Sequence, residues 1–175
     1  MKKLMVMTLM VVFGMAAIAQ EASTGNKIPS VTIKNIDGNS FDTKDITNDG
    51  KPIIISFWAL WCKPCKLEMD AYNENYADWV EETGVKIYAV SIDDARSTAK
   101  VLPFVSGKGW TMEMLLDPNS DFKRALNFQN VPQTFILDGK GNIVWQHTSF
   151  AEGGEYEIIK LLRKVANGED ISDQH

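Results

Sequence analysis

The sequence predicts an α/β fold in which helices cover both faces of a mixed central sheet. Strand-like and helix-like segments alternate through the first half of the chain, and a strand hairpin followed by a helix closes the second half. The run 53–58 is rich in β-branched and aromatic residues on both faces, as expected for a central strand that helices cover on each side. With 175 residues, 45% of them hydrophobic, the chain can bury a core without stabilising disulfides or metals.

The N-terminal segment has the pattern of a secretory signal peptide. Lys2 and Lys3 precede an apolar stretch, and the small-residue site at 17–19 precedes Gln20. We therefore expect a signal peptide at 1–19, a flexible leader at 20–27, one folded domain at 28–167 and a polar tail at 168–175. The alternative is an uncleaved membrane anchor, although the stretch is shorter than the roughly 20 apolar residues of a spanning helix.

Charge limits the partners of the mature chain. Without the signal peptide, the chain has 16 basic and 23 acidic side chains, so nucleic acid is not an expected partner.

The first half of the domain begins with a predicted hairpin. Residues 31–36 alternate apolar and polar positions, Asp37-Gly38 is a two-residue turn signal, and 39–44 forms the returning strand. After the strand at 53–58, a helix is expected from Pro64 to a stop at Gly84. Its inward stripe comprises Cys65, Met69, Tyr72, Tyr76, Trp79 and Val80.

The remaining elements continue the alternation. A helix is expected at 95–108 with a kink or interruption at Pro103, and a short helix capped by Asn119 or Ser120 should run to Leu126. The last helix, 155–166, should bury Ile158, Ile159, Leu162 and Val165. Further strands are predicted at 85–92, 112–116, 134–137 and 143–147.

The only two cysteines, Cys62 and Cys65, follow the central strand at the expected start of a helix. The helix N-terminus and Lys63 favour a thiolate at Cys62, and Pro64 suits the first helical position because its missing N–H needs no partner. We expect Cys62 to be the exposed nucleophile and Cys65, on the apolar side, to be the resolving thiol. The pattern predicts thiol–disulfide exchange.

Other interpretations of the cysteine pair fit less well. Half of a zinc site would need four ligands, and the chain has only two cysteines and two histidines. A structural disulfide closing so small a loop would stabilise the fold little. A peroxide-reactive thiol would have a threonine where Ala59 stands.

Four acidic residues are interpreted as solvated charges: Glu81, Glu82, Asp93 and Asp94.

The motif W-C-K-P-C after Phe57-Trp58-Ala59, together with V-P-Q-T-F at 131–135, resembles the thioredoxin superfamily. The signal peptide, the N-terminal hairpin, the strand and helix inserted between 95 and 116, and the C-K-L-E continuation look like its TlpA/ResA-like extracytoplasmic branch, over roughly 28–166. The resemblance implies a thioredoxin-like three-layer fold. It also implies a cis peptide bond before Pro132 and backbone contacts from Val131 to an extended substrate.

The resemblance implies two further site features. Ordinary thioredoxins carry a buried aspartate where this chain has Ser56, and Glu68 is the expected replacement, as a proton acceptor for Cys65. The alternative for Glu68 is a solvated helix charge. Trp58 is expected to pack in the core. Five residues are expected to line the substrate surface: Trp61, Lys63, Pro64, Val131 and Pro132.

The resulting hypothesis is an extracytoplasmic thiol–disulfide oxidoreductase that reduces disulfides in exported proteins, with apocytochrome c as one client that the resemblance implies. Electrons would come from a membrane dithiol donor, the Cys62–Cys65 pair would be the only redox group, with no added cofactor or metal, and the protein would be a monomer. A dithiol oxidase or isomerase remains an alternative. So does a copper-binding module, in which the thiols and His147 would be the ligands.

Overall fold

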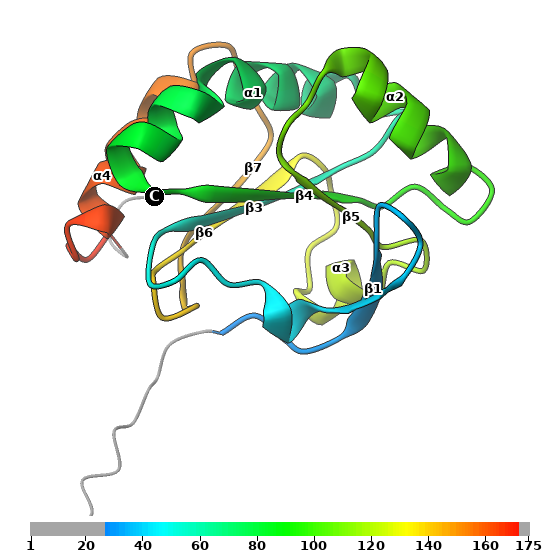
Figure 1. The fold of residues 1–175 in the computed structure, drawn as a ribbon, viewed down its shortest axis with the longest axis horizontal. Helices are drawn as coiled ribbons and strands as arrows, with labels where there is room; N and C mark the ends of the chain where they lie inside the picture. Colours follow the sequence, from blue (N-terminus) through cyan, green and yellow to red (C-terminus); the bar gives the residue numbers. More distant parts are fainter. Residues whose placement is uncertain (1–26, 172–175) are drawn as a thin grey trace, which may run out of the picture.

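The computed structural model describes residues 27–171, so the expected signal peptide and nearly all of the expected leader lie outside the described residues. A seven-stranded mixed sheet runs through the domain in the order β2-β1-β5-β4-β3-β6-β7 (Figure 1). Its strands are β1 (Thr32–Asn35), β2 (Ser40–Asp42), β3 (Ile53–Trp58), β4 (Lys86–Ser91), β5 (Glu113–Leu116), β6 (Gln133–Leu137) and β7 (Ile143–Thr148). The predicted strands and both hairpins are confirmed.

The central strand β3 is buried at every position. It pairs in parallel with β4 and antiparallel with β6, so its backbone groups bond on both sides and its end lies beside the start of β6. In the register of β3 and β6, Phe57 lies opposite Gln133. The chain that follows β3 therefore emerges next to Pro132.

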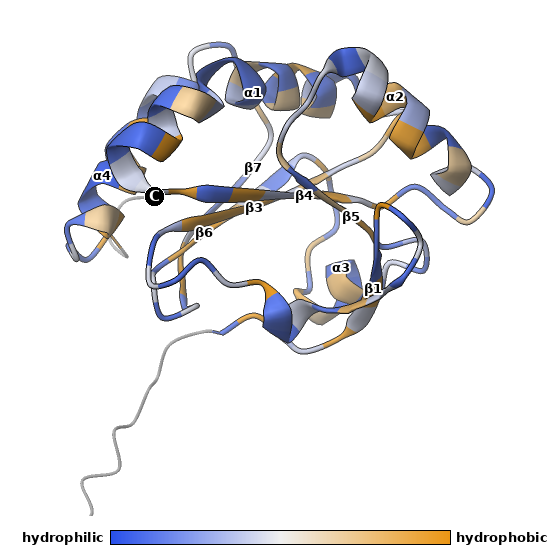
Figure 2. Cartoon of the chain, in the orientation of Figure 1, coloured by the Kyte–Doolittle hydropathy of each residue, from blue (hydrophilic) through white to orange (hydrophobic). Residues whose placement is uncertain are grey.

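Among residues 27–171, three α-helices cover one face of the sheet and a fourth lies on the other face (Figure 1). The first group is α1 (Lys63–Thr83), α2 (Val101–Lys108) and α4 (Glu155–Ala166), and the fourth helix is α3 (Asp121–Ala125). Two apolar clusters fill the layers, one under α1, α2 and α4 and one around Phe122 of α3. Figure 2 shows hydrophobic colour along the central strands and blue segments over the helices. The predicted three-layer fold is confirmed.

Two predictions about α1 and α2 need correction. Val80 of α1 was expected to face inward, but its side chain is 43% exposed. It lies at the margin of the buried helix face that contains Tyr72 and Trp79. Pro103 does not interrupt a helix. A 3-10 turn at Thr98–Lys100 leads into α2, and Pro103 is the third residue of α2, where a backbone N–H has no intrahelical partner to lose.

The cap of α3 is also different from the prediction. Ser120 is the N-cap residue, but its side chain makes no capping hydrogen bond. The carboxylate of Asp117 instead accepts the N–H groups of Asp121 at 2.7 Å and Lys123 at 3.0 Å. Asp117 is buried directly after β5, so its carboxylate, and not the Ser120 side chain, caps the helix.

The segment after α4 is not entirely polar in its packing. Ile171, in the expected polar tail, is 1% exposed and belongs to the apolar cluster under α1 and α4. Within residues 27–171, none of the helices combines the length and apolar character that a membrane span requires.

Candidate active site

The two cysteines form a disulfide at the start of α1, with an S–S length of 2.03 Å and Cα atoms 5.3 Å apart. Cys62 is the N-cap residue, and its sulfur accepts the N–H of Cys65 at 3.3 Å. Lys63 and Pro64 are the first two helical residues. The sequence predicted this placement to within one residue at Pro64.

The expected exposure of Cys62 is wrong for this disulfide-bonded form. Cys62 is 4% exposed and Cys65 is fully buried. The N-cap geometry explains the difference, because it turns the Cys62 sulfur back over the helix end toward the N–H of Cys65. The exposed position belongs to Trp61, at 69%, while Trp58 is buried and packs edge-on against Trp110.

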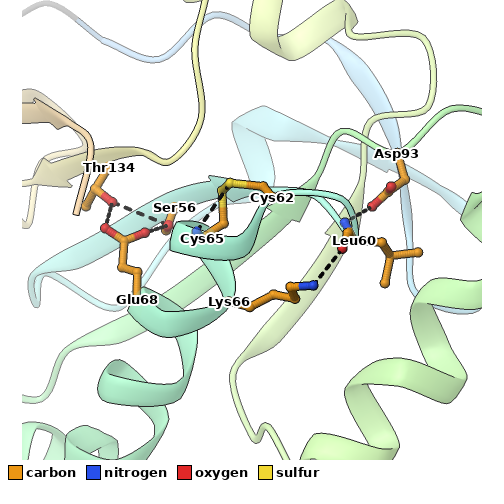
Figure 3. The surroundings of a disulfide bond; sticks show 8 residues. All are labelled: Ser56, Leu60, Cys62, Cys65, Lys66, Glu68, Asp93 and Thr134. Carbon is orange, nitrogen blue, oxygen red and sulfur yellow. Dashed lines mark hydrogen bonds between the residues drawn. A yellow bond between two sulfur atoms is a disulfide. The ribbon is translucent and has the colours of Figure 1, made fainter. Parts of the chain in front are cut away.

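Glu68 lies one turn beyond Cys65 on the buried side of α1, with 2% of its surface exposed. Its carboxylate accepts hydrogen bonds from Ser56 at 2.8 Å, Thr134 at 3.0 Å and Tyr72 at 3.2 Å. Figure 3 shows Ser56 and Thr134 converging on Glu68 beside the disulfide. The alternative of a solvated helix charge is therefore wrong.

Burial raises the pKa of Glu68 from 4.5 to about 7, since the charged form loses its water. The hydrogen bonds from Ser56, Thr134 and Tyr72 oppose this rise, because they favour the charged form. A carboxyl with such a pKa can both give and take a proton near neutral pH. Its neighbour Tyr72 has a pKa raised well above the usual 10, first by burial and then by the Glu68 charge.

The three hydroxyl donors to Glu68 are residues that sequence reasoning did not assign to the site. Ser56 was noted only as a departure from the thioredoxin pattern, Thr134 as a strand residue and Tyr72 as core. One signal could have found two of them, since Ser56 and Thr134 lie directly opposite each other in the β3 and β6 pair. Two facing hydroxyls in an otherwise apolar sheet centre require a polar partner.

A pocket of about 600 Å³ opens beside Glu68 between β7, the following loop and α4. Its lining includes Glu68, Tyr72, Thr134, Trp145, His147 and Phe150. Glu68, which is buried beside the disulfide, is therefore also one of the residues that line a cavity.

The peptide bond between Val131 and Pro132 is cis, as the resemblance implied. Pro132 is buried, and its carbonyl accepts the N–H of Ser149 at 2.9 Å. Val131 is half-buried two residues before β6, near the end of β3 from which the cysteine segment leaves. The structure thus brings the cysteine motif and the proline motif to the same end of the sheet.

Asp93 corrects another prediction, because it is not a solvated charge. It is 2% exposed, and its Oδ2 accepts the backbone N–H of Leu60 at 2.9 Å and the hydroxyl of Ser91 at 2.8 Å. The other acidic residues of that group, Glu81, Glu82 and Asp94, are exposed, and Glu82 is paired with Arg163.

Within residues 27–171, no cluster of three or more His, Cys, Asp or Glu side chains has the arrangement of a metal site. His147 is exposed on β7, where its ring stacks on Trp145 with centroids 5.6 Å apart.

The sheet, the disulfide at the N-terminus of α1 and the cis proline define a thioredoxin-fold protein with a C-x-x-C centre. More particularly, the chain belongs to the AhpC/TSA family, which matches residues 24–146.

Relatives within this class are named thiol–disulfide oxidoreductases. ResA of Bacillus thuringiensis (strain Al Hakam) is 29% identical over 152 residues, which are 87% of this chain and 84% of its own length. The thiol:disulfide interchange protein DsbE of Yersinia pestis is 27% identical over 153 residues, 85% of this chain and 78% of its own length. A thioredoxin-like protein from Porphyromonas gingivalis, solved in solution, is 51% identical, with a TM-score of 0.72 over 80% of this chain and 92% of that chain. The chain is a ResA-like thiol–disulfide oxidoreductase.

Proposed function

We propose that this oxidoreductase works outside the cytoplasm and reduces disulfide bonds in exported proteins, using its cysteine pair as the only redox group. The observation that carries the proposal is the pairing of a helix N-terminal disulfide with a buried carboxyl one turn further along α1. Glu68, with a pKa of about 7, can serve as the internal proton acceptor that Ser56 cannot be.

In the first step, the thiolate of Cys62 attacks one sulfur of the client disulfide. A bond forms between Cys62 and that sulfur, the client S–S bond breaks, and the second client sulfur leaves as a thiolate that takes a proton from water. The N–H of Cys65 and the helix N-terminus favour the anionic form of Cys62 in this step.

In the second step, Cys65 resolves the mixed disulfide. Glu68 accepts the Cys65 proton and the Cys65 thiolate attacks the Cys62 sulfur. The bond between Cys62 and the client breaks, and the first client sulfur leaves as a thiolate that takes a proton from water. Two electrons have then passed from the dithiol to the client, and the Cys62–Cys65 disulfide has formed. The client would lie on a surface lined by Trp61, Lys63, Pro64, Val131 and Pro132.

The sequence supports the remaining parts of the proposal. The signal-like residues 1–19 support export, and a membrane dithiol donor would return the protein to its reduced form. Apocytochrome c is the client class that the resemblance implies, because its haem-attachment cysteines must be reduced.

The equilibrium with glutathione tests the direction of transfer. Potentials of related dithiols range from about −270 mV for thioredoxin to about −120 mV for DsbA. We expect a potential nearer the thioredoxin end, measured as the fraction of disulfide across a series of reduced and oxidised glutathione. A potential near the DsbA end would show that the protein is an oxidase and would overturn the proposed direction.

A further inference from the structure

A second buried carboxylate, Asp93, lies on the opposite side of the disulfide from Glu68 (Figure 3). Oδ2 of Asp93 accepts the Leu60 N–H and the Ser91 hydroxyl, while the Asp93 N–H returns to the Ser91 Oγ at 3.1 Å. The other carboxylate oxygen, Oδ1, is buried and has no hydrogen-bond partner among residues 27–171. A buried carboxylate with only one oxygen satisfied is costly for folding, so a role beyond stability is indicated.

Asp93 contacts the segment that leads into the attacking cysteine, Cys62. Leu60 lies two residues before Cys62, and its peptide groups are held from two sides. Its N–H donates to Asp93, and its carbonyl accepts the ammonium of Lys66 at 2.9 Å. Lys66 itself belongs to the first turn of α1, so the segment is tied both to the loop after β4 and to the helix that Cys62 caps.

The same turn also holds the backbone of Cys62. The N–H of Cys62 donates to the carbonyl of Ala59 at 3.0 Å, so the turn that Leu60 lies in determines how Cys62 enters the helix. The entry angle matters because the Cys62 sulfur must stay at the N-cap to accept the Cys65 N–H. Asp93 is fixed in turn, since its carbonyl accepts the hydroxyl of Thr98 at 3.1 Å.

We propose that Asp93 is a positioning residue for Cys62: with Lys66 it clamps the Leu60 peptide and keeps the Cys62 sulfur at the helix N-terminus. The inference deepens the proposed function, because it rests on Cys62 being the attacking thiol. It makes a prediction of definite sign. Loss of the clamp raises the pKa of the Cys62 thiol toward the value of free cysteine, about 8.5.

A purely electrostatic role for Asp93 predicts the opposite sign. Removing a negative charge near a thiolate stabilises the thiolate and lowers its pKa. A purely structural role predicts a loss of stability with no change of the thiol pKa. The direction of the shift therefore separates the three explanations.

The experiment measures alkylation of the reduced full domain with iodoacetamide across a pH series, with the labelled cysteine identified by mass spectrometry. Asp93→Leu should move the Cys62 midpoint upward by about one pH unit, which is about tenfold slower labelling below the midpoint. Ser91→Ala, which removes one donor to Asp93 and leaves all charges in place, should move it upward by a smaller amount. Asp93→Asn, which keeps an acceptor oxygen, should lie closer to the wild type than Asp93→Leu.

Asp117→Asn is the matched control, because Asp117 is another buried carboxylate at the end of a neighbouring strand that accepts backbone N–H groups, those of α3. It should lower stability in urea and leave the Cys62 midpoint unchanged. If Asp93→Leu does not fold, Ser91→Ala decides: an upward shift supports the clamp, and no shift or a downward shift overturns it. The labelling needs no client, so an upward shift in a protein that fails the glutathione test would refute the proposed direction and keep the clamp.

Discussion

The hydroxyl of Ser56 on β3 donates a hydrogen bond of 2.8 Å to the carboxylate of Glu68 on α1. This contact shows how the chain holds a buried carboxyl beside its disulfide although its central strand carries no aspartate. The carboxyl comes from the helix, and the strand residue has become its hydrogen-bond donor. Thr134 completes the arrangement from β6, so three elements of the fold hold one proton-carrying group.

Replacement of Cys65 should trap clients. In Cys65→Ala the mixed disulfide on Cys62 has no resolving thiol, so client proteins should stay covalently attached and appear as higher-mass species that dithiothreitol releases. Non-reducing gels and mass spectrometry would detect them. Capture by Cys62→Ala, and not by Cys65→Ala, would mean that the two roles are reversed.

Glu68→Gln should slow the resolving step. The amide keeps the shape of the side chain but cannot accept the Cys65 proton. We therefore expect the client to be released from the mixed disulfide on Cys62 about 100-fold more slowly near pH 7. The wild-type rate should also rise with pH through a midpoint that the variant lacks. Glu81→Gln removes an exposed carboxylate from the same helix and should leave the rate unchanged. Equal rates for Glu68→Gln and the wild type would remove Glu68 from the mechanism.

The stability of the oxidised protein should fall as the pH rises from about 4.5 to 7. In this window the unfolded chain releases the Glu68 proton while the folded protein keeps it, so the folded state binds more protons. The free energy of unfolding should therefore decrease by about 3 kcal/mol across the window from this group and stay level above it. Urea unfolding of Glu68→Gln at several pH values should lack this decrease. A Glu68 contribution that grows with pH would contradict the raised pKa.

Ile171 should contribute to the core of the domain. Its side chain is 1% exposed in the cluster under α1 and α4, so Ile171→Ala should lower the free energy of unfolding by about 2–4 kcal/mol. Activity near neutral pH should persist at temperatures where the variant is folded. A change below 0.5 kcal/mol would show that residues after α4 do not pack in solution.

Local signals predicted most of the fold. The turn at Asp37-Gly38, the stop at Gly84 and the apolar stripe of α4 are properties of neighbouring residues, and each element appeared where its pattern indicated. The disulfide centre was equally local, since Cys62 and Cys65 lie within one turn of helix.

Long-range contacts account for what the sequence could not show. Asp93 reads as a surface charge beside Asp94, yet its partner Leu60 lies 33 residues earlier in the chain. The burial of Glu68 likewise depends on Thr134, 66 residues away, and only the strand register brings the two together. The exposure of Cys62 was misjudged because the N-cap geometry of a closed disulfide turns its sulfur over the helix end.

The pH dependence of thiol alkylation in the reduced wild-type protein tests whether the two cysteines differ as the proposed mechanism requires. We expect that one cysteine, Cys62, reacts first and titrates well below the value of about 8.5 for free cysteine, while Cys65 reacts slowly and only at higher pH. Two cysteines that react at equal rates, both with midpoints near 8.5, would contradict it.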